Sequence, residues 1–278
     1  SKNYVKKERI ISDFDGTITD IEEETKEFQE IYPEVFLKKL MKYSPEYLYE
    51  FNEIKKELRN EESKGFILGG EDALPSSADP YILTQATSQE MIKRMGLEVG
   101  DETKFMVDLY LEAISKVQGK ETHYREGKER TKKFLDGVLD KYDLIFVTNS
   151  NKEKVERYLK ELGNDYFCNI AVIGNAKKLF VNKNFDKVPK SFTPQNFKRD
   201  VLLRRENYYE ILEFLSRGSF SNKNTTVVGD IYELDLALPD YLGYNVVQIE
   251  NGYSKKHERD YLGSSFVKNY NELEKLLF

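Results

Sequence analysis

The stretch IISDFDGTITD, residues 10–20, joins a short apolar run to three acids. The two isoleucines are typical of a buried strand, and Asp13, Asp15 and Asp20 follow within a few residues. Carboxylates are costly to remove from water unless a cation or hydrogen-bond donors pair with them. The stretch therefore predicts either a solvated turn or a group of acids that meets a cation and does chemistry.

Similar apolar runs, typical of buried strands, occur in the second half of the chain. Short apolar runs alternate with helical patterns in YDLIFVTNS (142–150), TTVVGD (225–230) and YNVVQIENG (244–252). Strands that are apolar throughout and separated by helices are typical of a parallel sheet covered on both faces. The strand before Asp13 has the same character, so we expect it to belong to that sheet and the fold class to be α/β.

Between these regions the sequence has a helical period. Apolar residues recur at three- and four-residue steps in FLKKLMKYSPEYLYEFNEIKKEL and KFMVDLYLEAISKV. The dense Gly, Pro and Ser of residues 63–80 predict an irregular loop, and no strand is expected in this half. We therefore expect a discontinuous α/β core domain of residues 1–20 and 124–278 and an inserted α-helical cap domain of residues 21–123.

Composition limits the possible environments and partners. The 278 residues are 39% hydrophobic, which favours a folded globular protein. No apolar run is long enough to span a bilayer and no leader pattern opens the sequence, so we expect a cytoplasmic protein without a membrane partner. The net charge of −6, with Lys and Arg spread along the chain, argues against a nucleic-acid partner. The one cysteine, Cys168, excludes an internal disulfide and is expected to be a small buried hydrophobe.

Polar residues follow three of the predicted strands, and in an open parallel sheet the carboxyl ends of the strands form the ligand site. Asp13 and Asp15 follow the first strand, Thr148 the second and Asp230 the third. Mg²⁺ prefers oxygen ligands, and two carboxylates with a substrate phosphate suit it; the backbone carbonyl of Asp15 offers another oxygen. An aspartate held there can attack phosphorus, and a carboxyl two residues later can protonate the leaving oxygen.

Three motifs, in order, resemble those of the haloacid dehalogenase superfamily of phosphohydrolases. DFDGTIT (13–19) is similar to its first motif, LIFVTNS (144–150) to its second and TTVVGDIYELD (225–235) to its fourth. The wide insertion between the first two motifs matches family members that carry a helical cap there. The resemblance implies a Rossmann-like core, Mg²⁺ as cofactor, and hydrolysis of a small phosphorylated metabolite through an aspartyl-phosphate intermediate.

The resemblance also implies a role for each matching residue. Asp13 is similar to the nucleophile and metal ligand, and Asp15 to the general acid/base, with its backbone at the metal. Thr148 would bind the transferring phosphoryl group with Asn149 as a helper. Asp230 would hold Mg²⁺, and Asp235 would do so directly or through water.

The third motif departs from the family, which usually has a lysine, often followed by proline, before the helix that leads into the fourth motif. Arg204 and Arg205 stand in that place, and Lys177 and Lys178 are rivals earlier in the chain. A cation is needed to offset the clustered acids and orient the nucleophile. We favour Arg205, which is expected to open a helix and bind phosphate.

Two other functions remain open from the sequence. A phosphomutase or phosphotransferase could use the same aspartyl-phosphate, with transfer to a second hydroxyl instead of water. A regulatory module could keep the site and bind phosphate with little turnover, which the unusual third motif leaves open. Phosphate release from a panel of small esters is the observation that separates the hydrolase from both.

Overall fold

The computed structural model describes residues 5–278, and the chain divides into two compact units. The first unit contains the chain up to Ile21 together with Thr122–Phe278, and the second is Glu22–Glu121. Within residues 5–278, no helix combines the length and the apolar character that a bilayer crossing needs.

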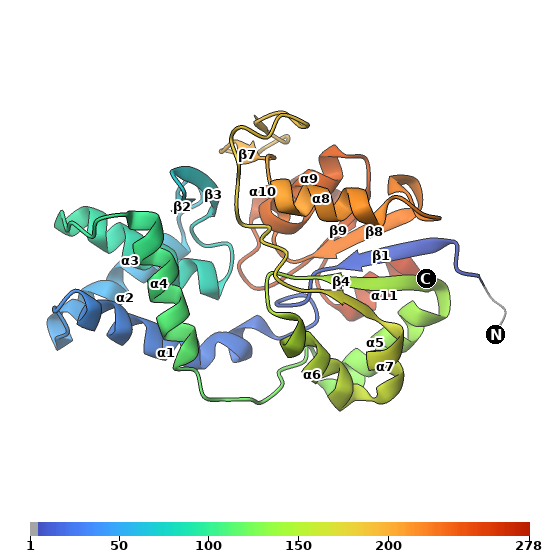
Figure 1. Ribbon diagram of the computed structural model, residues 1–278, viewed down its shortest axis with the longest axis horizontal. Helices are drawn as coiled ribbons and strands as arrows, with labels where there is room; N and C mark the ends of the chain where they lie inside the picture. Colours follow the sequence, from blue (N-terminus) through green and yellow to red (C-terminus); the bar gives the residue numbers. More distant parts are fainter. Residues whose placement is uncertain (1–4) are drawn as a thin grey trace. The chain divides into compact units, whose positions relative to one another are not determined.

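A six-stranded parallel sheet forms the centre of the first unit (Figure 1). Its strands lie in the order β10-β9-β8-β1-β4-β5, and every neighbouring pair is parallel. Their bounds are β1 Glu8–Ser12, β4 Tyr142–Val147, β5 Ala171–Ile173, β8 Thr225–Gly229, β9 Asn245–Ile249 and β10 Phe266–Val267. The α/β fold class expected from the apolar strands is confirmed.

Helices cover both faces of this sheet (Figure 1). One layer contains α5 Lys128–Lys141, α6 Lys152–Leu162, α7 Asn164–Asn169 and α11 Tyr270–Leu277. The other contains α8 Glu206–Leu215, α9 Ala237–Tyr241 and α10 Lys256–Leu262. Because successive strand residues face opposite sides, Ile10 belongs to the hydrophobic core under the first layer and Ile11 to the core under the second. A strand buried on both faces has a nearly continuous apolar run, such as Ile10–Ile11 in β1 and Val227–Val228 in β8.

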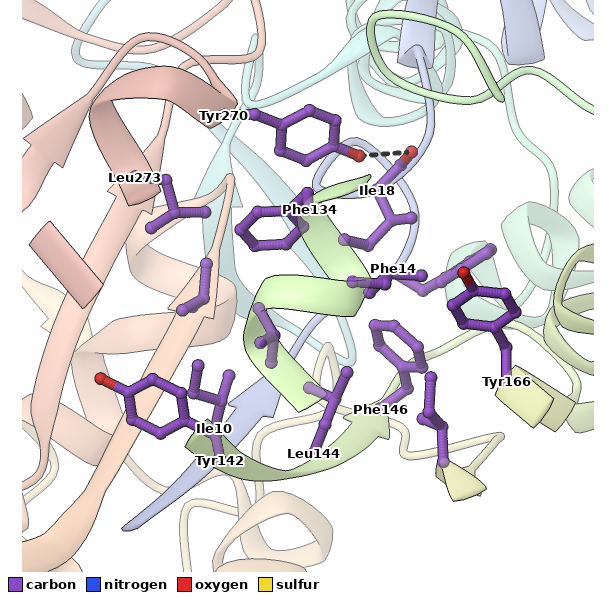
Figure 2. Close-up of a cluster of buried hydrophobic side chains, with 14 of the residues drawn as sticks. Ile10, Phe14, Ile18, Phe134, Tyr142, Leu144, Phe146, Tyr166, Tyr270 and Leu273 are labelled. Carbon is purple, nitrogen blue, oxygen red and sulfur yellow. Dashed lines mark hydrogen bonds between the residues drawn. The ribbon is translucent and has the colours of Figure 1, made fainter. Parts of the chain in front are cut away.

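The turn after β1 is anchored in the first of these cores (Figure 2). Phe14 is fully buried and makes edge-to-face contacts with Phe146 and Tyr158, each with ring centroids 5.2 Å apart. The hydroxyl of Tyr270 donates a hydrogen bond to the carbonyl of Ile18. The acids on either side of Phe14 therefore project from a turn whose backbone is held by core packing.

Short elements complete the first unit. A two-stranded antiparallel hairpin is formed by β6 Ser191–Phe192 and β7 Val201–Leu202, in the long connection between β5 and α8. A π-helical turn, η2 Tyr232–Leu236, follows β8 and leads into α9. Single 3₁₀ turns lie at η1 Asn222–Asn224 and η3 Gly263–Ser265.

The second unit is mainly helical and has its own aromatic core. Its helices are α1 Ile21–Lys39, α2 Pro45–Arg59, α3 Pro80–Met95 and α4 Glu102–Ser115. Phe28, Tyr32, Phe36 and Phe51 are buried and in ring contact along the helices α1 and α2.

Two local expectations are wrong. Residues 63–80 contain a β-hairpin, β2 Gly65–Leu68 paired with β3 Glu71–Pro75, and not an irregular loop. Gly69 and Gly70 both have positive φ at its turn, and a Gly-Gly pair between two apolar runs is the hairpin signal that the composition of the segment obscured. Cys168 is exposed and not buried, because its short helix α7 turns it away from the core side occupied by Tyr166.

Candidate active site

The three motifs meet at the carboxyl ends of β1, β4 and β8. Strand β1 lies between the other two, so its final residues adjoin both neighbours. The backbone N–H of Asp13 donates to the carbonyl of Val228 at 2.8 Å, which ties the first motif to the end of β8. The strands β4 and β8 lie on opposite sides of β1. The carboxyl ends of strands at such a point are the usual ligand site of open α/β sheets.

Glycine is required at position 16 for two reasons. Its φ is +80°, a conformation that other residues adopt with strain, and a Cβ there would lie 2.3 Å from Oδ2 of Asp230. The hydroxyl of Thr17 lies 3.3 Å from Oδ1 of the same aspartate. The turn of the first motif is thus packed against the acid of the fourth motif without space for a side chain.

Asp13, Asp230 and Asp235 form a compact acid cluster. One carboxylate oxygen from each lies within 4.8 Å of the other two. Asp230 and Asp235 are each 1% exposed, and the side chain of Asp13 is 11% exposed. Desolvation, reinforced by the charge of Asp235, raises the pKa of Asp13 to about 7. Such a cluster is unfavourable unless positive charge joins it.

Lys178 supplies part of that charge. Its ammonium nitrogen lies 3.1 Å from Oδ1 of Asp13 and 3.0 Å from Oδ1 of Asp235, with 2% of its side chain exposed. Burial alone would lower the pKa of Lys178, but the charges of the two aspartates outweigh it and raise the pKa above its ordinary value. Lys178 is therefore a permanent cation beside the candidate nucleophile.

The preference for Arg205 as the third-motif cation is not supported by its contacts. The Nη1 of Arg205 donates to the backbone carbonyls of Lys178 and Leu179, at 3.0 and 3.3 Å. The residue is fully buried, and this burial lowers its pKa to about 10. Arg205 supports the backbone of the lysine that reaches Asp13. The sequence favoured Arg205 because it begins a helix at a suitable number of residues before the fourth motif. Lys178 lies in a loop, and the sequence alone does not predict where this loop runs.

The other two rivals are Lys177 and Arg204. Lys177 is exposed beside Lys178. Arg204 donates through its guanidinium to the carbonyls of Lys183 and Val188, within the long connection that follows β5. Among the four cations considered from the sequence, Lys178 is the one whose ammonium contacts both Asp13 and Asp235.

Asp15 is held by donors from the second motif. Thr148 Oγ1 lies 3.2 Å and Ser150 Oγ 2.5 Å from its Oδ2, while the ammonium of Lys154 contacts its Oδ1. Thr148 was expected to bind phosphate, and its hydroxyl here lies at the candidate acid/base. Ser150 and Lys154 were not anticipated. A sequence signal was available, since Ser150 lies three residues and Lys154 seven residues after the predicted strand end at Val147.

Asn149 and Asp235 have supporting contacts within the site. Asn149 Oδ1 accepts the backbone N–H of Lys178 at 2.8 Å, which places the amide behind the lysine. Asp235 uses Oδ2 to accept the backbone N–H of Ile231 at 3.1 Å, so its side chain closes the turn that begins at Asp230.

Two further residues missed from the sequence hold the motifs in place. Asn251 Nδ2 donates to Oδ2 of Asp230 at 2.9 Å, and its side chain is buried beyond the end of β9. The guanidinium of Arg125 donates to the backbone carbonyls of Gly16, Thr17 and Glu250, at 2.6–2.8 Å. Neither belongs to a pattern that a single sequence reveals, because their partners are more than 20 residues away or are main-chain atoms.

The donor set fits a divalent oxygen-seeking cation. Three carboxylates share a small volume, and the Lys178 ammonium contacts two of them. Carboxylate oxygens in this number suit Mg²⁺ and offer none of the nitrogen or sulfur ligands that zinc prefers. Asp13 and Asp230 are the residues that would hold the ion, with Asp235 beside them.

Comparison with known proteins shows the family and the fold. A family model described as haloacid dehalogenase-like hydrolase matches residues 8–238. No curated protein matches the sequence at a significant level. The fold is similar to the haloacid dehalogenase-like family protein SP0104 from Streptococcus pneumoniae, with a TM-score of 0.55, 12% identity and 98% of each chain covered.

A second solved structure is similar over the whole chain. The haloacid dehalogenase hydrolase YfnB from Bacillus subtilis, described as bound to magnesium, has a TM-score of 0.50 and 14% identity, with 98% of this chain and 99% of that chain covered. At these identities the likeness concerns the fold alone. The family match spans most of the chain, so the protein belongs to the haloacid dehalogenase-like hydrolases.

Proposed function

We propose that this hydrolase is a Mg²⁺-dependent phosphatase that cleaves a phosphate monoester of a small metabolite. The observation that carries the proposal is the pair of aspartates, Asp13 and Asp15, at the end of β1. Asp13 contacts Lys178, whereas Asp15 contacts the Ser150 hydroxyl and the Lys154 ammonium. Two carboxyls with separate partners suit the two separate roles of nucleophile and acid/base.

In the first half-reaction an oxygen of Asp13 attacks phosphorus. The bond between phosphorus and the ester oxygen breaks, and the leaving oxygen takes a proton from Asp15. The products are the alcohol and an acyl phosphate on Asp13. In the second half-reaction Asp15 accepts a proton from water, whose oxygen attacks the same phosphorus, and inorganic phosphate leaves with the carboxylate of Asp13 restored.

The surrounding residues hold charge during these steps. The Lys178 ammonium stabilises negative charge on the oxygens of Asp13 and the phosphoryl group, and it needs no rearrangement to do so. The Thr148 hydroxyl lies 3.2 Å from Asp15, and we expect it to donate to a phosphoryl oxygen when the ester is bound. When bound, Mg²⁺ would neutralise phosphate charge beside Asp13 and Asp230.

The test is a panel of phosphorylated metabolites assayed for phosphate release, with and without Mg²⁺. We expect release from at least one ester in the presence of Mg²⁺, loss of release on chelation, and loss of release in Asp13→Asn. Asp165→Asn, which neutralises an exposed acid in α7, is the matched control and should retain full activity.

Product analysis distinguishes the hydrolase from the two other functions. Phosphate appearing on a second hydroxyl of an acceptor, with none released to water, would replace the proposal with a phosphotransferase. Unchanged phosphate release in folded Asp13→Asn would contradict the aspartyl-phosphate route itself. Mg²⁺ binding without turnover on any ester would favour a binding module.

A further inference from the structure

A third buried acid lies between the two acids of the fourth motif. Glu233 is in the π-helical turn Tyr232–Leu236 and is 1% exposed. The phosphatase chemistry gives it no role. Its carboxylate accepts from Arg199, whose Nε lies 3.1 Å from both Oε1 and Oε2. The two side chains are 1% and 4% exposed, so this ion pair is almost completely removed from water.

Arg199 reaches this turn from a distant part of the chain. It lies in the connection of residues 174–205 between β5 and α8, which also contains the β6–β7 hairpin. The connection is internally braced, since the N–H of Leu203 donates to the Lys190 carbonyl at 3.0 Å. The same connection carries Lys178 near its start. One segment thus contacts the acid cluster through Lys178 and the turn that bears two of its acids through Arg199.

The segment from Asp230 to Asp235 contains most of this π-helical turn and also bonds to other parts of the chain. A π-helical turn is a wide and uncommon geometry with weaker regular bonding than an α-helix. Within the segment, the Asp235 N–H donates to the Ile231 carbonyl at 2.8 Å and the Ile231 N–H donates to Asp235 Oδ2 at 3.1 Å; from outside, Tyr208 Oη donates to the Asp235 carbonyl at 2.7 Å. A buried ion pair adds little net stability, but it fixes one arrangement because any other leaves a charge unpaired.

We propose that Arg199 is a positioning residue that, through Glu233, fixes the turn carrying Asp230 and Asp235 and thereby sets the affinity of the site for its divalent cation. The inference rests on the proposed function only in taking this ion to be the one used in catalysis. Contacts behind metal ligands commonly change metal affinity by ten- to a hundredfold when they are removed.

The experiment titrates Mg²⁺ into the full chain by isothermal calorimetry, without substrate. Arg199→Gln is expected to bind Mg²⁺ at least about tenfold more weakly than the wild type while keeping its circular dichroism spectrum. In activity assays the same variant should need more Mg²⁺ for half-maximal rate and recover most of its rate at saturating Mg²⁺. Arg9→Gln is the matched control: it removes the Arg9–Asp143 ion pair between β1 and β4 and should bind Mg²⁺ like the wild type.

Folded Arg199→Gln with wild-type Mg²⁺ affinity would overturn the inference. If the single variant does not fold because Glu233 has lost the Arg199 charge, the Arg199→Gln/Glu233→Gln double variant, which removes both charges of this ion pair, takes its place. It too is expected to bind Mg²⁺ weakly, and wild-type affinity in it would overturn the inference. A wild type that binds Mg²⁺ but cleaves no ester would defeat the phosphatase proposal alone, because the calorimetry still decides the role of Arg199.

Discussion

The ammonium nitrogen of Lys178 lies 3.1 Å from Oδ1 of Asp13 and 3.0 Å from Oδ1 of Asp235, so one buried cation joins the first and fourth motifs. Replacement of this lysine by methionine keeps the apolar stem and removes the charge. We expect Lys178→Met to lower kcat for phosphate release by about 10²–10³-fold, the usual effect of deleting one preorganised electrostatic group. Lys177→Met, one residue earlier and exposed, is the control. Equal losses in the two variants would contradict this role.

Gly16→Ala should damage the metal site through sterics. The new Cβ would lie 2.3 Å from Oδ2 of Asp230, so either the turn or the aspartate must move. Lower Mg²⁺ affinity and a lower Tm are both expected, measured by calorimetry and thermal unfolding. Gly100→Ala, at φ +74° with no atom within 4 Å of its Cβ, isolates the backbone strain, which costs about 1 kcal/mol. Mg²⁺ affinity reduced equally in both variants would refute the steric explanation.

Asn251→Ala should weaken Mg²⁺ binding without changing the acids themselves. Its amide donates to Asp230 Oδ2 at 2.9 Å and so orients that carboxylate. The expected loss is about tenfold or more in Mg²⁺ affinity, determined by titration calorimetry. Asn222→Ala, whose amide donates to the Leu242 carbonyl elsewhere in the same unit, should bind Mg²⁺ normally. Normal binding by Asn251→Ala as well would show that Asp230 is oriented by its other contacts.

Glu258 makes the stability of the first unit depend on pH. Burial raises the pKa of Glu258 above its ordinary value of 4.5. The backbone N–H of Lys255, the Gln248 amide and the charge of Lys255 oppose this rise. The negative charge of Glu250 adds to it, and Glu233 is also nearby. Below about pH 4.5 the carboxyl is protonated in both the folded and unfolded states and contributes nothing. As the pH rises, the unfolded state loses its proton first, so the wild type is progressively destabilised until the folded pKa is passed.

The neutral variant Glu258→Gln removes this dependence. Its Tm minus that of the wild type should increase from pH 4.5 upward and level off above the folded pKa, as followed by circular dichroism. The amide oxygen of glutamine can still accept the Lys255 N–H that Glu258 Oε1 accepts at 2.9 Å. A difference that stays flat across this pH range would show that the pKa of Glu258 is not raised in the folded state.

Local pattern was sufficient to predict the sheet, because a strand covered on both faces has a nearly continuous apolar run. The sequence also predicted that the acids of the motifs lie at one edge of the sheet, because the carboxyl ends of parallel strands meet at the same edge. The third-motif cation could not be chosen. Lys178 and Arg205 lie 27 residues apart, and which of them faces Asp13 depends on how the connection between β5 and α8 folds back.

The supporting residues were hidden for a related reason. Arg199 and Glu233 are ordinary charged residues in the sequence, and only the tertiary fold buries them together. Asn251 likewise resembles any turn residue after a strand until its amide meets Asp230. The β2–β3 hairpin differs, because the sequence contains a signal for its turn at Gly69–Gly70. The surrounding Pro and Ser led instead to the prediction of an irregular loop.

Because β1 pairs with β8 as well as β4, the earliest strand is completed by one made some 200 residues later. During translation, Asp13 and Asp15 leave the ribosome long before Asp230, Asp235 and Asn251 exist. A nascent chain that ends before these residues therefore contains Asp13 without the other two acids of its cluster. The cluster of Asp13, Asp230 and Asp235 can therefore assemble only after residue 235 has been synthesised, and a chain that stops before β8 has no such cation site.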